Sequence, residues 1–214
     1  MIAVCDLIAF RIIPVVALND PSMAGPLGEA LIAGGLPIAE VTLRSPNAIH
    51  ALRELAAMPG IVVGAGTVVN ETQVDAVVDA GASFVVSPGL SAAVVRRCQH
   101  YDLPILAGVA NPTDVMAALD LGLTVMKFFP AESSGGCATL QALAGPFPQV
   151  RFVPTGGISL ANVGEYLALP TVAAVGGSWM VAPTLIEQGD FATITSLTHD
   201  AVVLVGSLSA EGMR

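Results

Sequence analysis

The feature that most constrains this chain is a regular alternation of short β-branched runs with Ala- and Leu-rich segments. The eight runs, at a spacing of roughly 20 to 25 residues, give the expected strands 12–18, 37–43, 61–65, 83–87, 104–107, 124–128, 151–154 and 171–175. Runs that are mostly apolar indicate strands buried on both faces, as in a parallel sheet covered by helices. The pattern predicts an α/β fold, specifically a (β/α)8 TIM barrel, with a doubly wound open sheet as the alternative.

The segments between the runs have the spacing of amphipathic helices. Apolar residues recur three and four positions apart, for example at Ala48, Leu52 and Leu55. Asn70 precedes another such segment and has the side chain of a helix cap. Because no linker, charge block or low-complexity stretch interrupts the alternation, we expect residues 1–214 to form one domain.

Composition excludes several classes of protein. With 54% hydrophobic and 12% charged residues, the chain has too much apolar surface to remain disordered. The mean hydropathy of +0.75 raises the possibility of a membrane protein, but Gly, Pro or a charge interrupts every stretch of the roughly 20 apolar residues that a spanning helix needs. We therefore expect no membrane partner and assign the apolar excess to a large core or to subunit contacts.

Net charge and cysteine content indicate which partners the protein can bind and in which compartment we expect it. A net charge of −9 argues against nucleic acid, because phosphate backbones require a basic face. The three cysteines, Cys5, Cys98 and Cys137, are widely spaced and contain no CxxC, so we expect inert core thiols in a reducing, cytoplasmic setting. The first residues lack the basic n-region of a secretory signal and a small-residue cleavage site after an apolar stretch, so we expect no secretion.

Lys127 is the only lysine in the chain and sits near the end of the expected strand 124–128. By strand alternation it shares a face with Val125 and Leu123, which can be the lumen of a barrel. Burial disfavours the ammonium form, so such a lysine is a candidate nucleophile toward a carbonyl. The alternative is a lysine whose stem is buried while its amine reaches water.

The expected strand 37–43 carries a second candidate group. With a period of two, Glu40, Thr42 and Arg44 point to one side, and the intervening residues are apolar. A carboxylate inside a parallel strand is costly unless it is paired or held for proton transfer. Arg44 is either its structural partner or a bidentate ligand for a substrate carboxylate.

Glycine-rich segments follow several expected strands. Residues 64–68 and 87–90 leave room for a ligand near the backbone, but no GxGxxG opens a helix, so a dinucleotide site is not indicated. Residues 155–158 and 176–179 follow the seventh and eighth strands, where barrels often bind phosphate through backbone N–H groups. The alternative for each is a tight turn.

A metal site is not expected. His50, His100 and His199 fall in expected helices, away from the strand ends, and form no ligand set.

Taken together, the motifs of this chain resemble the KDPG/KHG family of class I aldolases, which includes 2-keto-3-deoxy-6-phosphogluconate (KDPG) aldolase. The segments that carry the resemblance run along nearly the whole chain in the family's order, at positions 40–44, 64–67, 87–90, 127–132, 145–148, 154–158 and 177–179.

The resemblance implies a (β/α)8 barrel, usually a homotrimer, that reversibly cleaves a phosphorylated 2-keto-3-deoxy sugar acid to pyruvate and glyceraldehyde 3-phosphate. It implies no cofactor other than the covalent Schiff base on the enzyme's own lysine. The implied roles are the Schiff base for Lys127, general acid/base for Glu40, substrate carboxylate binding for Arg44 and Thr67, phosphate binding for Gly156, Gly157, Gly177 and Ser178, and pocket lining for Pro88 and Phe129.

One segment departs from the family pattern. Ala107 and Asn111 stand at the end of the fifth strand, where the family usually has proline and threonine, which bears on the aldehyde side of the substrate. The arginine motif and the last glycine loop resemble the gluconate enzymes more than the galactonate ones.

The alternatives are a 4-hydroxy-2-oxoglutarate (KHG) aldolase or another pyruvate-dependent aldolase, a metal-free sugar-phosphate isomerase, and a non-catalytic sugar-phosphate binder.

Overall fold

The computed structural model describes residues 2–211 as an alternation of parallel strands and helices. The strands are β1 (Ile12–Val16), β2 (Ile38–Thr42), β3 (Val62–Gly66), β4 (Phe84–Val86), β5 (Ile105–Leu106), β6 (Gly108–Val109), β7 (Val125–Phe128), β8 (Arg151–Pro154) and β9 (Val175–Gly177). The α-helices are α1 (Val4–Ala9), α2 (Ala24–Ala33), α3 (Ala48–Ala56), α4 (Glu71–Asp79), α5 (Ala92–His100), α6 (Pro112–Asp120), α7 (Gly136–Ala144), α8 (Val163–Leu167), α9 (Pro183–Gln188) and α10 (Phe191–Glu211). Three short 3-10 helices are η1 (Pro21–Met23), η2 (Glu132–Ser134) and η3 (Trp179–Val181).

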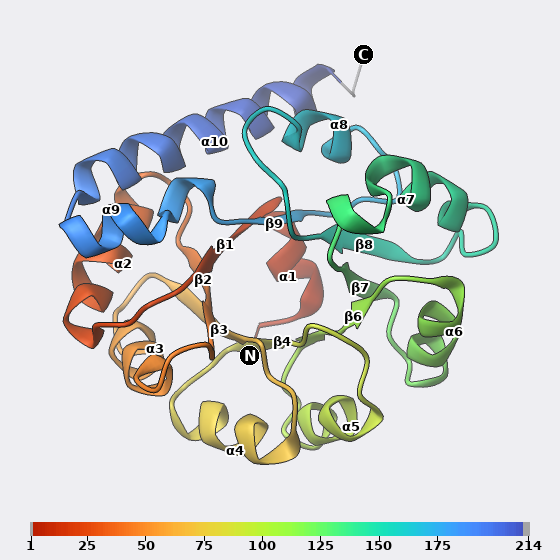
Figure 1. The fold of residues 1–214 in the computed structure, drawn as a ribbon, viewed down its shortest axis with the longest axis horizontal. Coiled ribbons are helices and arrows are strands. Elements are labelled where there is room, and N and C mark those ends of the chain that lie inside the picture. The colour runs from red at the N-terminus through yellow and green to blue at the C-terminus, as the bar shows by residue number, and fades with distance from the viewer. Residues whose placement is uncertain (1, 212–214) are drawn as a thin grey trace.

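The strands pair in parallel within two sheets. Six strands follow the order β5-β4-β3-β2-β1-β9, and three follow the order β6-β7-β8. Two isolated bridges connect β8 and the residue after it to the chain around β9: Phe152 of β8 pairs with Val172, and Thr155 pairs with Gly176 of β9. The sheet curls around a common centre with helices on its outside (Figure 1), and the predicted α/β class with a parallel sheet is confirmed.

Local sequence explains where several helices begin and which face they bury. Asn70 accepts a hydrogen bond from the backbone N–H of Gln73, as its place before the helix predicts. On α3 the buried residues Ala48, Leu52 and Leu55 recur at helical spacing, again as predicted. The apolar stripes of the outer helices thereby cover strands whose residues are almost all buried.

Two expected strands differ from those observed. The fifth is divided into β5 and β6 on either side of Ala107, where the chain passes from one sheet to the other. The eighth begins at Val175 rather than at residue 171, because residues 175–177 are the ones that pair with β1. Gly176 and Gly177 therefore end a strand, which corrects the expectation that they form the loop after it.

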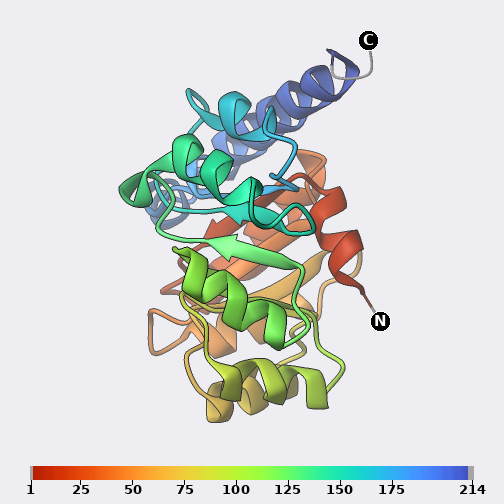
Figure 2. The same ribbon diagram turned by 90° about the vertical axis from the view of Figure 1, so that its right-hand side faces the viewer.

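The two ends of the sheet are built differently. Helix α1 and the start of the described chain lie at the end where the strands begin, opposite the direction of the strand arrows (Figure 2). Arg11 helps to hold this end together, because its guanidinium donates to the carbonyl oxygens of Ala173 at 2.6 Å and Leu167 at 3.3 Å. The other end, where the strands finish, is open for a functional site.

The cysteines are not all core residues. Cys98 is buried, but Cys137 is only half-buried and Cys5 is exposed, which corrects the expectation of three core thiols. Cys5 belongs to α1, at the end of the sheet where the strands begin, and it lies on the exposed side of that helix, whereas Leu7 of α1 is buried.

Helix α10 lies lengthwise against α2, α8 and α9 (Figure 1). By length and composition alone, its residues 191–208 could cross a membrane, although Asp200 interrupts them. About a fifth of that window is buried against the rest of the chain.

Candidate active site

The site begins with Lys127, which β7 places among buried residues. Its side chain is 7% exposed, and its Nζ atom lies 3.4 Å from Oε1 of Glu40. The same Nζ lies 5.1 Å from the centre of the Phe129 ring, within the range of a cation–π contact. The amine is therefore enclosed and paired, and it does not extend into bulk water as the alternative interpretation required.

Glu40 reaches Lys127 from the opposite part of the sheet. It lies in the middle of β2 and its side chain is 3% exposed. Its carboxylate rests on Gly66 of β3, where an added Cβ would overlap Oε1 of Glu40. Glycine at position 66 leaves the space that the carboxylate occupies beside the lysine.

This pair is a buried ion pair, which needs close geometry to compensate for the lost hydration of both charges. A buried carboxylate within hydrogen-bond reach of an amine can accept and return a proton during a reaction. The geometry therefore combines a nucleophile with an adjacent general acid/base.

A cavity of about 300 Å3 adjoins the pair at the ends of the strands. Its lining residues are Val15, Arg44, Phe129, Thr155, Gly156, Gly157, Ile158, Gly176, Gly177 and Ser178. Phe129 connects it to Lys127, because its ring both lines the cavity and lies near the amine. Six of the residues predicted from the sequence thus surround one space.

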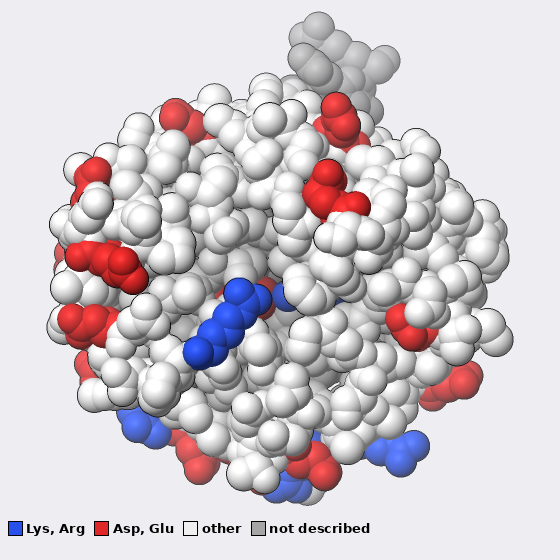
Figure 3. Space-filling model, viewed as in Figure 1, with Lys and Arg blue, Asp and Glu red and all other residues white. Residues whose placement is uncertain are grey.

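The charge of the cavity differs from that of the protein as a whole. Arg44 follows β2 and extends along the cavity wall as an exposed side chain. Figure 3 shows basic atoms within a hollow at the centre of this face, while acidic residues lie around its periphery. In a chain of net charge −9, this basic centre favours an anionic ligand.

The two glycine pairs line the cavity in different ways. Gly156 and Gly157 lie in the loop after β8, with φ angles of 99° and 82° that side chains rarely adopt. Gly177 is the last residue of β9, and Ser178 follows it as an exposed residue. A loop and a strand end, rather than two loops, form this wall.

Thr67 and Pro88 lie outside this cavity lining. Thr67 directly follows β3 and adopts a φ of 64°, a left-handed conformation that is rare for a β-branched residue. Pro88 follows β4 and lines a neighbouring cavity of about 230 Å3 together with Val68 and Leu90. Backbone strain of the kind seen at Thr67 concentrates at functional sites.

The segment that departs from the family pattern is engaged in backbone structure. Asn111 caps α6, and its side chain accepts a hydrogen bond from the N–H of Asp114 at 3.0 Å. Ala107 is fully buried, and its carbonyl accepts a hydrogen bond from the N–H of Lys127 at 2.9 Å. Ala107 therefore holds the backbone of Lys127, whereas Asn111 holds the start of α6, and neither residue lines the main cavity.

Sequence reasoning did not identify four lining residues of the cavity: Val15, Thr155, Ile158 and Gly176. Val15 looks like an ordinary core residue of the expected strand 12–18. Thr155, Ile158 and Gly176 belong to the glycine-rich segments 155–158 and 176–179, and their place beside Gly156, Gly157 and Gly177 is the signal that could have identified them.

Among the side chains that the structure describes, those of residues 2–208, no group of three His, Cys, Asp or Glu is placed to hold a metal ion. His50, His100 and His199 lie in α3, α5 and α10, as predicted.

Comparison with known proteins agrees with these features. The family model "KDPG and KHG aldolase" matches residues 5–197. The KHG/KDPG aldolase of Escherichia coli K12 is 45% identical over 192 residues, which cover 89% of this chain and 90% of the relative.

Solved structures give the same family. A KDPG aldolase from Legionella pneumophila, with pyruvate captured at low pH as a covalent carbinolamine intermediate, superposes with a TM-score of 0.89 at 43% identity, covering 92% of this chain and 96% of its own. The enzyme of Zymomonas mobilis ZM4 with 3-phosphoglycerate has a TM-score of 0.87 at 44% identity, covering 93% and 95%. The resemblance seen in the sequence is thus confirmed, and the chain belongs to the KDPG and KHG aldolase family.

Proposed function

We propose that this protein is a class I aldolase that reversibly cleaves 2-dehydro-3-deoxy-6-phosphogluconate to pyruvate and glyceraldehyde 3-phosphate. One observation carries the proposal: the single lysine of the chain is buried 3.4 Å from a buried glutamate, beside an arginine-lined cavity. The relatives' names supply the substrate, and a captured pyruvate carbinolamine in a relative supports the covalent chemistry.

The first half of the proposed reaction breaks a carbon–carbon bond. Glu40 takes a proton from the ammonium of Lys127, and the neutral amine attacks the C2 ketone to form a carbinolamine. Glu40 returns that proton to the hydroxyl group that leaves C2, so that water departs and an iminium forms. Glu40 takes the proton of the C4 hydroxyl, and the C3–C4 bonding pair moves into the iminium to form an enamine. Glyceraldehyde 3-phosphate then leaves as the aldehyde.

The second half returns the enzyme to its starting state. Glu40 gives its proton to C3 of the enamine, which regenerates an iminium. Water hydrolyses this iminium and releases pyruvate and the free amine. The 3.4 Å separation of Nζ and Oε1 suits one carboxylate that serves both transfers, since C3 is bonded to the C2 carbon that carries Nζ and C4 lies one bond further along.

Substrate binding follows from the charges around the cavity. Arg44 and Thr67 are assigned to the pyruvate carboxylate, and Pro88 and Phe129 to the pocket wall. The glycines Gly156, Gly157 and Gly177 with Ser178 are assigned to the phosphate, which backbone N–H groups and a hydroxyl can bind. All of these residues except Thr67 and Pro88 line the same cavity, which supports the assignments.

We also propose that residues 1–214 form a single domain and that its strands close into a complete (β/α)8 barrel. The bridges from Phe152 to Val172 and from Thr155 to Gly176 support closure between β8 and β9. The hydrogen bond from Lys127 N–H to Ala107 O supports it on the other, at the point where β5 passes into β6.

We further propose a cytoplasmic homotrimer that needs no added cofactor and binds neither membranes nor nucleic acid. Three free thiols and a net charge of −9 are in keeping with this setting. Multi-angle light scattering on the purified protein tests the trimer, and EDTA treatment, which should leave activity unchanged, tests the absence of a metal.

The enzymatic proposal is tested by turnover and by proton exchange. Wild-type protein should release pyruvate from the phosphogluconate substrate with a higher kcat/KM than from 4-hydroxy-2-oxoglutarate or the galactonate epimer. It should also exchange the methyl protons of pyruvate with D2O, and Glu40→Gln should slow this exchange by about 10² to 10⁴. Glu54→Gln, an exposed change on α3, is the matched control. Binding of ligand without exchange would identify a non-catalytic binder.

A further inference from the structure

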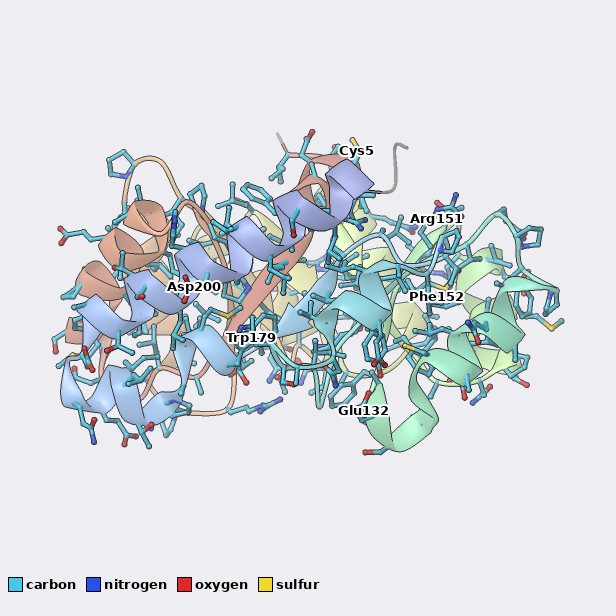
Figure 4. The ribbon with its side chains drawn as sticks, turned by 90° about the horizontal axis from the view of Figure 1, so that it is seen from above. Cys5, Glu132, Arg151, Phe152, Trp179 and Asp200 are labelled. Atoms are coloured by element: carbon cyan, nitrogen blue, oxygen red, sulfur yellow. The ribbon has the colours of Figure 1, made fainter. Side chains whose placement is uncertain are left out.

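Tyr166 and Glu132 form a contact near the cavity that the reaction does not use. Tyr166 belongs to α8 and is 1% exposed, and its hydroxyl donates a hydrogen bond to Oε1 of Glu132. Glu132 begins η2 and is exposed, at the opposite end of the molecule from Cys5 (Figure 4). Burial, together with the neighbouring Glu132, raises the pKa of Tyr166, so its hydroxyl stays protonated and remains a donor.

Glu132 contacts the glycine loop directly. Its backbone N–H donates to the carbonyl of Gly156 at 3.1 Å, and the N–H of Ala131 donates to the carbonyl of Thr155 at 2.8 Å. The Cβ and Cγ atoms of Glu132 lie so close to Gly157 that an added Cβ there would overlap them. The side chain of Glu132 therefore packs against the loop, and it is not among the residues that line the cavity.

The residue before α8 also contacts the glycine loop, residues 155–158, near the point where that loop ends. Asn162, which precedes α8, donates from Nδ2 to the carbonyl of Gly157 at 3.0 Å and accepts from the N–H of Ser159 at 2.8 Å. Tyr166 comes one turn later on the same helix. One helix thus holds the loop twice, directly through Asn162 and indirectly through Tyr166 and Glu132.

The conformation of the loop explains why such support is useful. Gly156 and Gly157 have positive φ angles, and glycine has more conformational freedom to lose than any other residue. Backbone N–H groups bind an anion well only if they already point at it, because ordering them on binding costs affinity.

We infer that Glu132 and Tyr166 are positioning residues that fix the N–H groups of loop 155–158 and thereby set the affinity for the substrate's phosphate, an inference that rests on the proposed function. The Tyr166 hydroxyl also holds the Glu132 carboxylate at a fixed place. Without that hydrogen bond, a mobile negative charge would lie next to the glycine loop.

The test compares two substrates that differ at the end this loop would bind. In Tyr166→Phe the buried ring is kept and the hydroxyl is lost. We expect its KM for the phosphorylated substrate to rise about tenfold, in line with the loss of a hydrogen bond to a charged group, with kcat changed by no more than about twofold. Its KM for unphosphorylated 4-hydroxy-2-oxoglutarate should stay at the wild-type value.

Two further variants separate positioning from charge and from general structure. Glu132→Gln keeps an acceptor for Tyr166 and the same stem, so it should retain the wild-type KM, whereas Glu132→Ala should behave like Tyr166→Phe. Glu165→Gln, an exposed carboxylate next to Tyr166 on α8, is the matched control and should change nothing.

The inference is overturned if Tyr166→Phe leaves both KM values unchanged, or if it raises both by the same factor, because a general structural role would not distinguish the substrates. If wild-type protein cleaves neither substrate, the proposed function itself is wrong. Calorimetric titration with inorganic phosphate then still tests the loop: a roughly tenfold weaker Kd for Tyr166→Phe supports the inference, and equal values reject it.

Discussion

The Nζ atom of Lys127 lies 3.4 Å from Oε1 of Glu40, although 87 positions separate the two residues in the chain. Both side chains are almost wholly buried, at 7% and 3% exposure. Strands β7 and β2 bring them together across the centre of the curled sheet. Their proximity links the stability of the fold to the chemistry proposed for it.

Removing either member of this pair should destabilise the protein more than removing both. Lys127→Met and Glu40→Gln should each lower the free energy of unfolding by about 3 kcal/mol, because each leaves an uncompensated group in a buried site. The double variant should recover much of that loss. Urea denaturation at neutral pH measures the cycle.

The control for this cycle pairs Lys127→Met with Glu54→Gln on the outer surface of α3. There the two effects should add within about 0.5 kcal/mol. If the changes in the free energy of unfolding also added for Lys127→Met and Glu40→Gln, the two side chains would not interact.

Arg44 should act on substrate affinity rather than on folding. Arg44→Lys keeps the positive charge but loses the planar fork that binds a carboxylate at two points, so the KM for pyruvate in methyl-proton exchange should rise about tenfold. NMR exchange rates across a pyruvate titration measure this. Arg53→Lys, on the outer helix α3, should leave KM unchanged, and a similar rise there would contradict the role of Arg44.

Asn111 should matter for stability and not for substrate preference. Its side chain caps α6, so Asn111→Ala should cost about 1 kcal/mol, while Asn111→Thr should cost only a few tenths because threonine also caps helices. Denaturant unfolding gives both values. A change in the substrate preference of Asn111→Thr would show that the position acts on the ligand after all.

Cys98 should give the protein a pH-dependent loss of stability in alkali. Burial raises the pKa of its thiol from 9.0 to about 12, so the folded state holds its proton while the unfolded state releases it. Stability from this group is present below about pH 9 and is lost as the pH rises toward 12.

Urea unfolding at pH 8 and at about pH 10.5 measures this loss, which should be smaller in Cys98→Ala. In the native protein at pH 8, Ellman's reagent should modify the exposed Cys5 and spare Cys98. Rapid reaction of Cys98 in the folded state would contradict its burial.

Much of the fold could be predicted because hydrophobic pattern and position agree along most of the chain. The first seven expected strands overlap observed ones, since each is a β-branched run bounded by helix signals. The last strand was misplaced because Val175–Gly177 contains two glycines, which are poor strand formers. Pairing with Ile12 to Pro14 of β1 overrides that preference, and no local signal encodes it.

The site could be predicted in part for a similar reason. A lysine and a glutamate within apolar strands are conspicuous, so Lys127 and Glu40 could be found from the sequence. Tyr166 and Glu132 could not, because one resembles a core aromatic residue and the other an ordinary surface carboxylate. Their contact exists only when α8 lies against η2, and the left-handed φ of Thr67 is likewise imposed by tertiary structure.

The most direct measurement is reduction of the protein with borohydride in the presence of pyruvate, followed by peptide mass mapping. Since Lys127 is the only lysine, the competing primary amine is that of the amino terminus, and the two lie in different peptides. The account predicts one reduced pyruvate on Lys127, none in Lys127→Met, and loss of turnover in that variant. Absence of an adduct on Lys127, or normal turnover by Lys127→Met, would contradict it.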